Sequence, residues 1–284
     1  MLPSRLALLS ALLMLCLVGV SAYLRLSAAQ LGCQPWPDCY AQGFRQTSPA
    51  DTQQHPVARL THRVLASAIG VAVLLLVFAS FVPRSQRPRQ FWIALSALVL
   101  TASLAALGRT TPGTYHPGVA SGNLLGGLAL LALFTWLAID AVVATGHERK
   151  ARLHVQLLAG TTLALLAVQV VVGAMLSTSG AAAACPDLAG CGAGSPAAAL
   201  HLMHRPLALT LLAVGGALSL ALWRAGGFGR GLASALVVCI ALQIGIGAAM
   251  VSSQFPLWLG LLHNFGAALL TMTAVGSARW ASRS

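Results

Sequence analysis

The sequence predicts an all-α membrane protein with eight transmembrane helices, arranged as two tandem four-helix bundles. Of its 284 residues 57% are hydrophobic and only 8% are charged, and the mean hydropathy is +0.81. This composition leaves too little polar surface to cover a water-soluble globule, so the solvent must be lipid. Closed helices are expected because an unpaired backbone is costly in lipid, and the short alternating segments of a β-barrel are missing from the sequence.

Eight apolar runs are near the length of about 20 residues that crosses a hydrocarbon core about 30 Å thick. They are expected near residues 5–27, 57–82, 91–108, 118–144, 153–178, 197–223, 230–251 and 256–281. The first run has no convincing small-residue cleavage site after its core, and Arg25 follows it. We therefore interpret it as a retained helix rather than a removed signal peptide.

The second half of the chain repeats the first, which predicts a domain boundary between 1–146 and 147–284. His62-Arg63 in the second run recurs as His204-Arg205 in the sixth, and the charged segment GHERKAR joins the halves. Four helices return a chain to its starting side, so both halves should have the same orientation. Such a parallel repeat has a pseudo-two-fold axis along the membrane normal.

The charges predict the topology. The net charge of +12 is scattered in short clusters beside helix ends and forms no basic stripe, which argues against nucleic acid as a partner. One predicted side holds most of the basic residues, namely Arg5, Arg84, Arg87, Arg89, Arg149, Lys150, Arg152, Arg224, Arg230, Arg279 and Arg283. The other side holds Arg25, Arg45, Arg59 and Arg109. By the positive-inside rule both termini are expected to be cytoplasmic.

Four of the six cysteines lie in the two loops assigned to the outer side, as the pairs Cys33-Cys39 and Cys185-Cys191. Outside a bacterial inner membrane such pairs can oxidise, so two disulfide staples are the favoured interpretation, with a redox role left open. Gln169 and Gln243, inside the fifth and seventh runs, are expected to pack between helices or to touch the polar edge of a ligand.

Three of the eight histidines, His62, His204 and His263, lie one to two turns inside the outer end of an even-numbered run. A single one could serve only as a helix–helix hydrogen bond. Their matched depth favours metal ligation, because two neutral imidazoles from facing helices can hold a six-coordinate haem iron. His204 and His263 form such a pair in the second half. His201 shares a helix face with His204 and could support it or line a vestibule.

The first half offers His62 without a matching partner, because Asn123 stands where the repeat has His263 and an amide is a poor ligand for haem iron. A haem there would be five-coordinate, or would take a second ligand from solvent or from a loop histidine, His55 or His116. An open coordination position suits oxidative chemistry, whereas a closed pair of histidines suits electron transfer.

Arg63 and Arg205 follow the proposed ligands by one residue and point about 100° around the helix from them. A cation inside a membrane is expensive unless it is paired. The propionates of a porphyrin are suitable partners, since arginine binds carboxylates through a planar fork. The alternative is that both side chains extend to the outer headgroups.

These features together resemble the haem A synthase family over nearly the whole chain. The resemblance rests on Arg25-Leu26-Ser27 followed by GCQPWPDC, on the two His-Arg pairs, on NLLGG at Asn123 and on the late His263. It implies oxidation of the C8 methyl group of haem O to a formyl group, giving haem A, with a bound haem b that relays electrons. The resemblance thus implies an oxidoreductase that serves cytochrome oxidase assembly in the bacterial inner membrane, with its cysteine loops expected in the periplasm.

Carried onto this chain, the resemblance makes His204 and His263 the haem b ligands and the second half the haem b side. The first half becomes the substrate-haem side, with His62, Asn123 and Arg59 as the candidates for catalysis; the family commonly has Glu at the position of Arg59. A haem O-producing enzyme, an electron acceptor and a second copy of the chain are the protein partners this function allows. Two other functions stay open: a non-enzymatic carrier of haem O or haem A, and a b-type electron-transfer cytochrome.

Overall fold

The computed structural model describes residues 2–40, 55–81, 88–109, 116–145, 153–185, 187–188, 190–191 and 194–282. In these segments the helices are α1 (Leu2–Ala28), α2 (Pro56–Phe81), α3 (Pro88–Arg109), α4 (Pro117–Thr145), α5 (Leu153–Thr178), the short 3-10 helix η4 (Ala181–Ala184), α6 (Pro196–Ala225), α7 (Gly227–Ser252) and α8 (Leu257–Ala281). All eight α-helices are long and apolar enough to cross a membrane. The prediction of an all-α polytopic membrane protein is confirmed.

Helix starts follow from the chemistry of the first turn. Pro56, Pro88, Pro117 and Pro196 each open a helix, where the missing backbone N–H costs nothing and the fixed φ favours the helical conformation. At α6 the side chain of Ser195 also accepts a hydrogen bond from the Ala198 backbone N–H at 3.1 Å. This cap satisfies one of the unpaired donors of the first turn.

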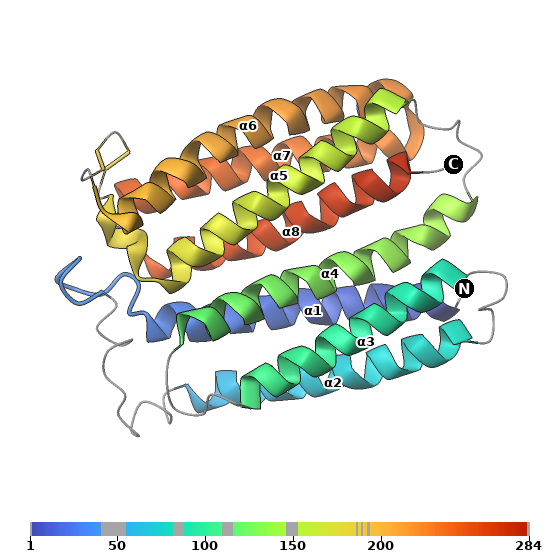
Figure 1. The fold of residues 1–284 in the computed structure, drawn as a ribbon, viewed down its shortest axis with the longest axis horizontal. Helices are drawn as coiled ribbons and strands as arrows, with labels where there is room; N and C mark the ends of the chain where they lie inside the picture. Colours follow the sequence, from blue (N-terminus) through green and yellow to red (C-terminus); the bar gives the residue numbers. More distant parts are fainter. Residues whose placement is uncertain are drawn as a thin grey trace.

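The helices form two groups of four that lie side by side (Figure 1). Helices α1–α4 pack on one another, as do α5–α8, and the groups meet where α1 and α4 contact α8 and where α4 contacts α5. The ends of the chain lie at one end of the bundle, and both cysteine loops lie at the other (Figure 1). The predicted joint at 146–147 lies outside the described residues, and the pseudo-two-fold axis remains a prediction.

Each group has its own apolar core, and a third cluster joins them at the end that carries the cysteine loops. Phe134 and Leu131 are fully buried in the first core, and Leu218 and Leu222 in the second. The third cluster contains side chains of both halves, namely Leu26, Ala29, Leu31, Tyr40, Ala182, Val251 and Phe255. The loop after α1 therefore packs on the second half.

A buried ion pair joins the halves near the opposite end. Asp140 of α4 binds Arg279 of α8, and both side chains are largely buried. Gln90 of α3 donates a second hydrogen bond to the Asp140 carboxylate at 3.0 Å. The guanidinium carbon of Arg279 also lies 5.7 Å from the ring centroid of Trp136. Because both charges are withdrawn from water, each depends on the other.

Replacing Asp140 by Leu should destabilise the protein by about 3–5 kcal/mol, since it leaves the Arg279 charge buried without its partner. The double variant Asp140→Leu, Arg279→Met should recover most of that loss. The thermal unfolding midpoint of the purified protein in detergent measures both. A double variant no more stable than Asp140→Leu would contradict this account of the interface.

Candidate functional site

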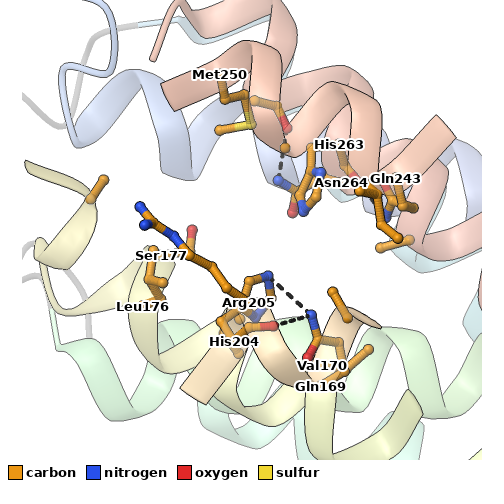
Figure 2. Close-up of a pocket in the computed structure, with 18 of the residues that line it drawn as sticks. Gln169, Val170, Leu176, Ser177, His204, Arg205, Gln243, Met250, His263 and Asn264 are labelled. Atoms are coloured by element: carbon orange, nitrogen blue, oxygen red, sulfur yellow. Dashed lines mark hydrogen bonds between the residues drawn. The ribbon is translucent and has the colours of Figure 1, made fainter. Parts of the chain in front are cut away.

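The predicted histidine pair comes together in the second half. His204 of α6 and His263 of α8 face each other across an open space (Figure 2), with ring centroids 6.5 Å apart and ring planes at 60°. A bond from a metal to an imidazole nitrogen is about 2.0–2.1 Å long and that nitrogen lies about 1 Å from the ring centroid, so two imidazoles on opposite sides of one metal have centroids about 6 Å apart. The observed separation matches this arrangement.

Four polar atoms at this site are buried without a hydrogen-bond partner among the described residues. They are Nδ1 of His204, Nδ1 of His263, and the side-chain oxygens of Gln169 and Gln243. Buried polar atoms in proteins are nearly always paired, because leaving one unpaired costs about 1–3 kcal/mol. A gathering of four around one space is typical of a site built for a ligand.

The two glutamines anchor the histidine backbones. The Gln169 amide nitrogen donates to the His204 carbonyl at 3.1 Å and lies 3.2 Å from Nε2 of the same ring (Figure 2). The Gln243 amide nitrogen donates to the His263 carbonyl at 3.0 Å. Of the two predicted roles the structure shows helix–helix packing at both positions, with the side-chain oxygens left for another partner.

Two glycines let one edge of each histidine ring come close to the neighbouring helix. A Cβ added at Gly173 of α5 would be 3.1 Å from Cε1 of His204, and one at Gly247 of α7 would be 3.4 Å from Cε1 of His263. Each glycine follows a glutamine of the same helix by four residues, one turn further along. In each Gln-x-x-x-Gly pattern the glutamine binds the carbonyl of the histidine, and the glycine leaves space for the histidine ring.

The space between the rings belongs to a cavity of about 360 Å³ with mainly apolar walls. Its volume lies in the range of ordinary ligand sites. The second half supplies most of the wall, and the first half completes it with Leu26, Leu31, Tyr40, Leu124 and Leu128. A largely apolar ligand with a few polar groups fits this lining.

Tyr40 brings the loop after α1 into the cavity wall. The side chain is 5% exposed, and burial raises the pKa of Tyr40 to about 12 against the opposing effects of a hydrogen bond with the Ala182 backbone and of the nearby Arg25 charge. The phenol therefore stays protonated and neutral over the physiological pH range.

His201 and Arg205 also line the cavity. The His201 ring is 4% exposed and contacts the Ala181 carbonyl at 3.0 Å, so it serves as the predicted wall of the vestibule. Arg205 donates to the carbonyls of Leu188 and Asp187, at 2.6 and 3.0 Å. Both carbonyls lie inside the loop closed by the Cys185–Cys191 disulfide, and so the structure gives Arg205 an acceptor that the sequence did not indicate.

The first-half candidates do not form an equivalent pair. His62 and Asn123 are half-buried on α2 and α4, and neither lines the cavity. Arg59 and Arg63 are exposed. His55, considered as a loop ligand, instead contacts the Tyr23 hydroxyl through Nδ1 at 3.0 Å.

The described residues contain no group of three or more His, Cys, Asp or Glu side chains that could hold a metal ion. Two facing imidazoles alone are too few ligands for a structural metal site, which takes about four from protein. They are the number needed when a macrocycle supplies the remaining ligands. The donor set of the second half therefore fits an iron porphyrin.

The fold and the site define the class of protein: a polytopic membrane protein with a histidine-lined cavity whose wall comes mainly from the second group of helices and is completed by the first. Residues 4–275 match the model of the COX15-CtaA family, described as cytochrome oxidase assembly protein. The chain is also similar to the heme A synthase of Shewanella oneidensis, with 26% identity over 312 aligned positions that cover 92% of this chain and 91% of that protein. The chain belongs to the COX15-CtaA family, which confirms the resemblance found in the sequence.

Both predicted disulfides, Cys33–Cys39 and Cys185–Cys191, are formed in the structure, and Cys16 and Cys239 are free. Under denaturing conditions without reductant, a maleimide should therefore modify two of the six cysteines, and after reduction all six. Intact mass measures the number of adducts. Modification of more than two without reductant would contradict the pairing.

Proposed function

We propose that this protein is a haem A synthase that oxidises the C8 methyl group of haem O to a formyl group, with haem b bound in the second half between His204 and His263. The family match and the name of the Shewanella relative support the reaction. The facing imidazoles support the haem b site, and they are the observation that carries the proposal.

Haem b bound there would supply one-electron transfer, because two protein ligands leave no open position on its iron. The chain's own contribution is positioning. Gln169 and Gln243 fix the histidine backbones, and Gly173 and Gly247 fix the rings. The apolar wall excludes water, which lowers the local dielectric and strengthens the polar contacts that remain.

The substrate is assigned to the first half, where residues 1–146 hold one histidine ligand candidate, His62. Asn123 can donate or accept a hydrogen bond but is a poor ligand for iron, so a haem bound through His62 would keep one face open for chemistry. The exposed guanidiniums of Arg59 and Arg63 suit the propionates of that haem. Among these residues we assign no general base.

Conversion of a methyl to a formyl group adds one oxygen and removes two hydrogens, an oxidation by four electrons. Two successive hydroxylations give a geminal diol, which loses water to leave the aldehyde. The reaction therefore needs an electron acceptor or an oxidant outside this chain. An oxidase or monooxygenase of this kind belongs in the bacterial inner membrane, with the termini in the cytoplasm and the disulfide loops in the periplasm.

A second candidate function is a carrier that holds haem O or haem A without oxidising it. The absence of a paired histidine opposite His62 favours this alternative, since Asn123 occupies the position that corresponds to His263. A b-type electron-transfer cytochrome would need only His204 and His263.

Expression with a haem O source, in a host that lacks its own haem A synthase, should yield haem A. Extraction of the pigments and chromatography measure the product. Retention of haem O without haem A would reject the enzyme and support the carrier, whereas neither pigment with haem b present would support the cytochrome.

His204→Ala and His263→Ala should each abolish a low-spin b-type absorption spectrum in the purified protein, because a six-coordinate iron needs both ligands. His154→Ala is the matched control, since His154 is exposed at the start of α5. A low-spin spectrum retained in both cavity variants would reject the ligand pair.

A further inference from the structure

The side-chain amide of Gln169 contacts two atoms of His204. Its nitrogen donates to the His204 backbone carbonyl at 3.1 Å and lies 3.2 Å from Nε2 of the His204 ring (Figure 2). A carbonyl oxygen only accepts hydrogen bonds, so the atom that faces it is the amide nitrogen and not the amide oxygen. The same nitrogen carries a second N–H, which is the donor for Nε2.

This contact fixes the position of the proton on the His204 ring. An amide N–H only donates, so Nε2 accepts with its lone pair, and the proton of the neutral imidazole lies on Nδ1. Nδ1 lies 3.6 Å from a Cβ added at Gly173 of α5, whereas Nε2 is not within 4 Å of that position. Nε2 is therefore the nitrogen left for a metal, and Gln169 occupies its single lone pair.

His263 has no such competitor. The Gln243 amide nitrogen donates to the His263 carbonyl at 3.0 Å, and neither nitrogen of the His263 ring has a hydrogen-bond partner among the described residues. Its Nδ1 lies 3.8 Å from a Cβ added at Gly247, as Nδ1 of His204 lies near Gly173. The two ligand candidates thus have similar neighbours and differ in one hydrogen bond.

That hydrogen bond makes the two ligands unequal. A bond between iron and His204 needs the lone pair of Nε2, so it breaks the hydrogen bond from Gln169, whereas a bond between iron and His263 breaks none. A His204 ring that leaves the iron regains the N–H of Gln169 and keeps a partner inside the apolar wall. A detached His263 ring would have no partner there, which is unfavourable for a buried polar atom.

We propose that Gln169 makes His204 the releasable ligand of the second-half site, while His263 is the permanent one. The inference rests on the proposed function, because it takes the cavity ligand to be an iron porphyrin held by both rings. In the exchange the bond from iron to Nε2 of His204 breaks, Nε2 accepts the N–H of Gln169, and a small neutral molecule takes the vacated position. The site is then suited to electron transfer when closed and to binding such a molecule when open.

The test uses carbon monoxide as the small molecule. The full-length protein in detergent is loaded with iron protoporphyrin IX and reduced, and absorption spectra at rising carbon monoxide concentration measure the affinity. The proteins are the unchanged chain, Gln169→Met and Gln243→Met. Methionine is unbranched like glutamine and has no N–H donor in its side chain. Each variant loses one bond to a histidine carbonyl, and only Gln169→Met also loses the bond to Nε2.

Gln169→Met should weaken binding of carbon monoxide by about 2- to 10-fold, the effect of one ordinary hydrogen bond, because the detached His204 ring loses its partner. Gln243→Met should change the affinity by less than about twofold, because His263 stays on the iron before and after the exchange. Weakening in Gln169→Met that does not exceed the weakening in Gln243→Met would overturn the proposal.

Single-histidine variants test the same difference without a change at Gln169. His204→Ala leaves the iron to His263, and His263→Ala leaves it to His204. The first should therefore bind iron protoporphyrin IX about 2- to 10-fold more tightly than the second. Equal binding, or tighter binding by His263→Ala, would overturn the proposal even if Gln169→Met does not fold.

The unchanged chain separates this inference from the function on which it rests. If it forms no low-spin complex with iron protoporphyrin IX, the haem b site is rejected, and the inference with it. A low-spin complex in the unchanged chain without the differences expected among the variants would reject the releasable ligand alone and leave the haem b site in place.

Discussion

The arrangement of the histidine pair depends on one constraint that lipid imposes. A polar side chain inside an apolar helix bundle needs a hydrogen-bond partner within the protein. Gln169 and Gln243 satisfy their amide nitrogens on the carbonyls of His204 and His263. Those two hydrogen bonds tie α5 to α6 and α7 to α8 at the same depth. The opposed imidazoles, the glycines beside them and the cavity between them all follow from this pairing, because a glutamine displaced by one turn would reach neither carbonyl.

The two groups of four helices differ in the contacts that α3 and α7 make with the helix after each. In α4, where a histidine would complete a second pair, a Cβ at Gly126 would be 2.5 Å from Cδ2 of Leu104, and one at Gly122 would be 3.0 Å from Cδ2 of Leu107. The corresponding small residue of α8, Gly266, lies against Gln243 instead. Leu104 therefore stands against α4 where Gln243 stands against α8. A leucine side chain cannot form the hydrogen bond to a backbone carbonyl that Gln243 forms. At these positions α3 therefore places leucine side chains against α4, whereas α7 places Gln243 against α8.

The number of helices and their approximate limits could be predicted from the sequence, because membrane thickness sets the length of a span. The facing of His204 and His263 could also be predicted, because both lie at a similar depth on even-numbered helices. The contacts across the halves could not. Neither the Arg25 bonds to Ser177 and Asn264 nor the burial of Tyr40 has a periodic signal. Periodicity identifies the apolar face of a helix but not the helix opposite it. Arg205 was expected to meet a propionate or the headgroups, and the loop carbonyls it binds depend on a local fold that sequence spacing does not specify.

The loop after α1 closes over the second half at the turn between α7 and α8. Trp36 stacks on Phe255 with ring centroids 5.5 Å apart, and Gly32 approaches so closely that a Cβ there would be 3.1 Å from the Leu257 nitrogen. Synthesis from the N-terminus makes this loop first and its docking surface last. The wall of the cavity is therefore complete only after the last helix has been made, and either half produced alone would lack part of that wall.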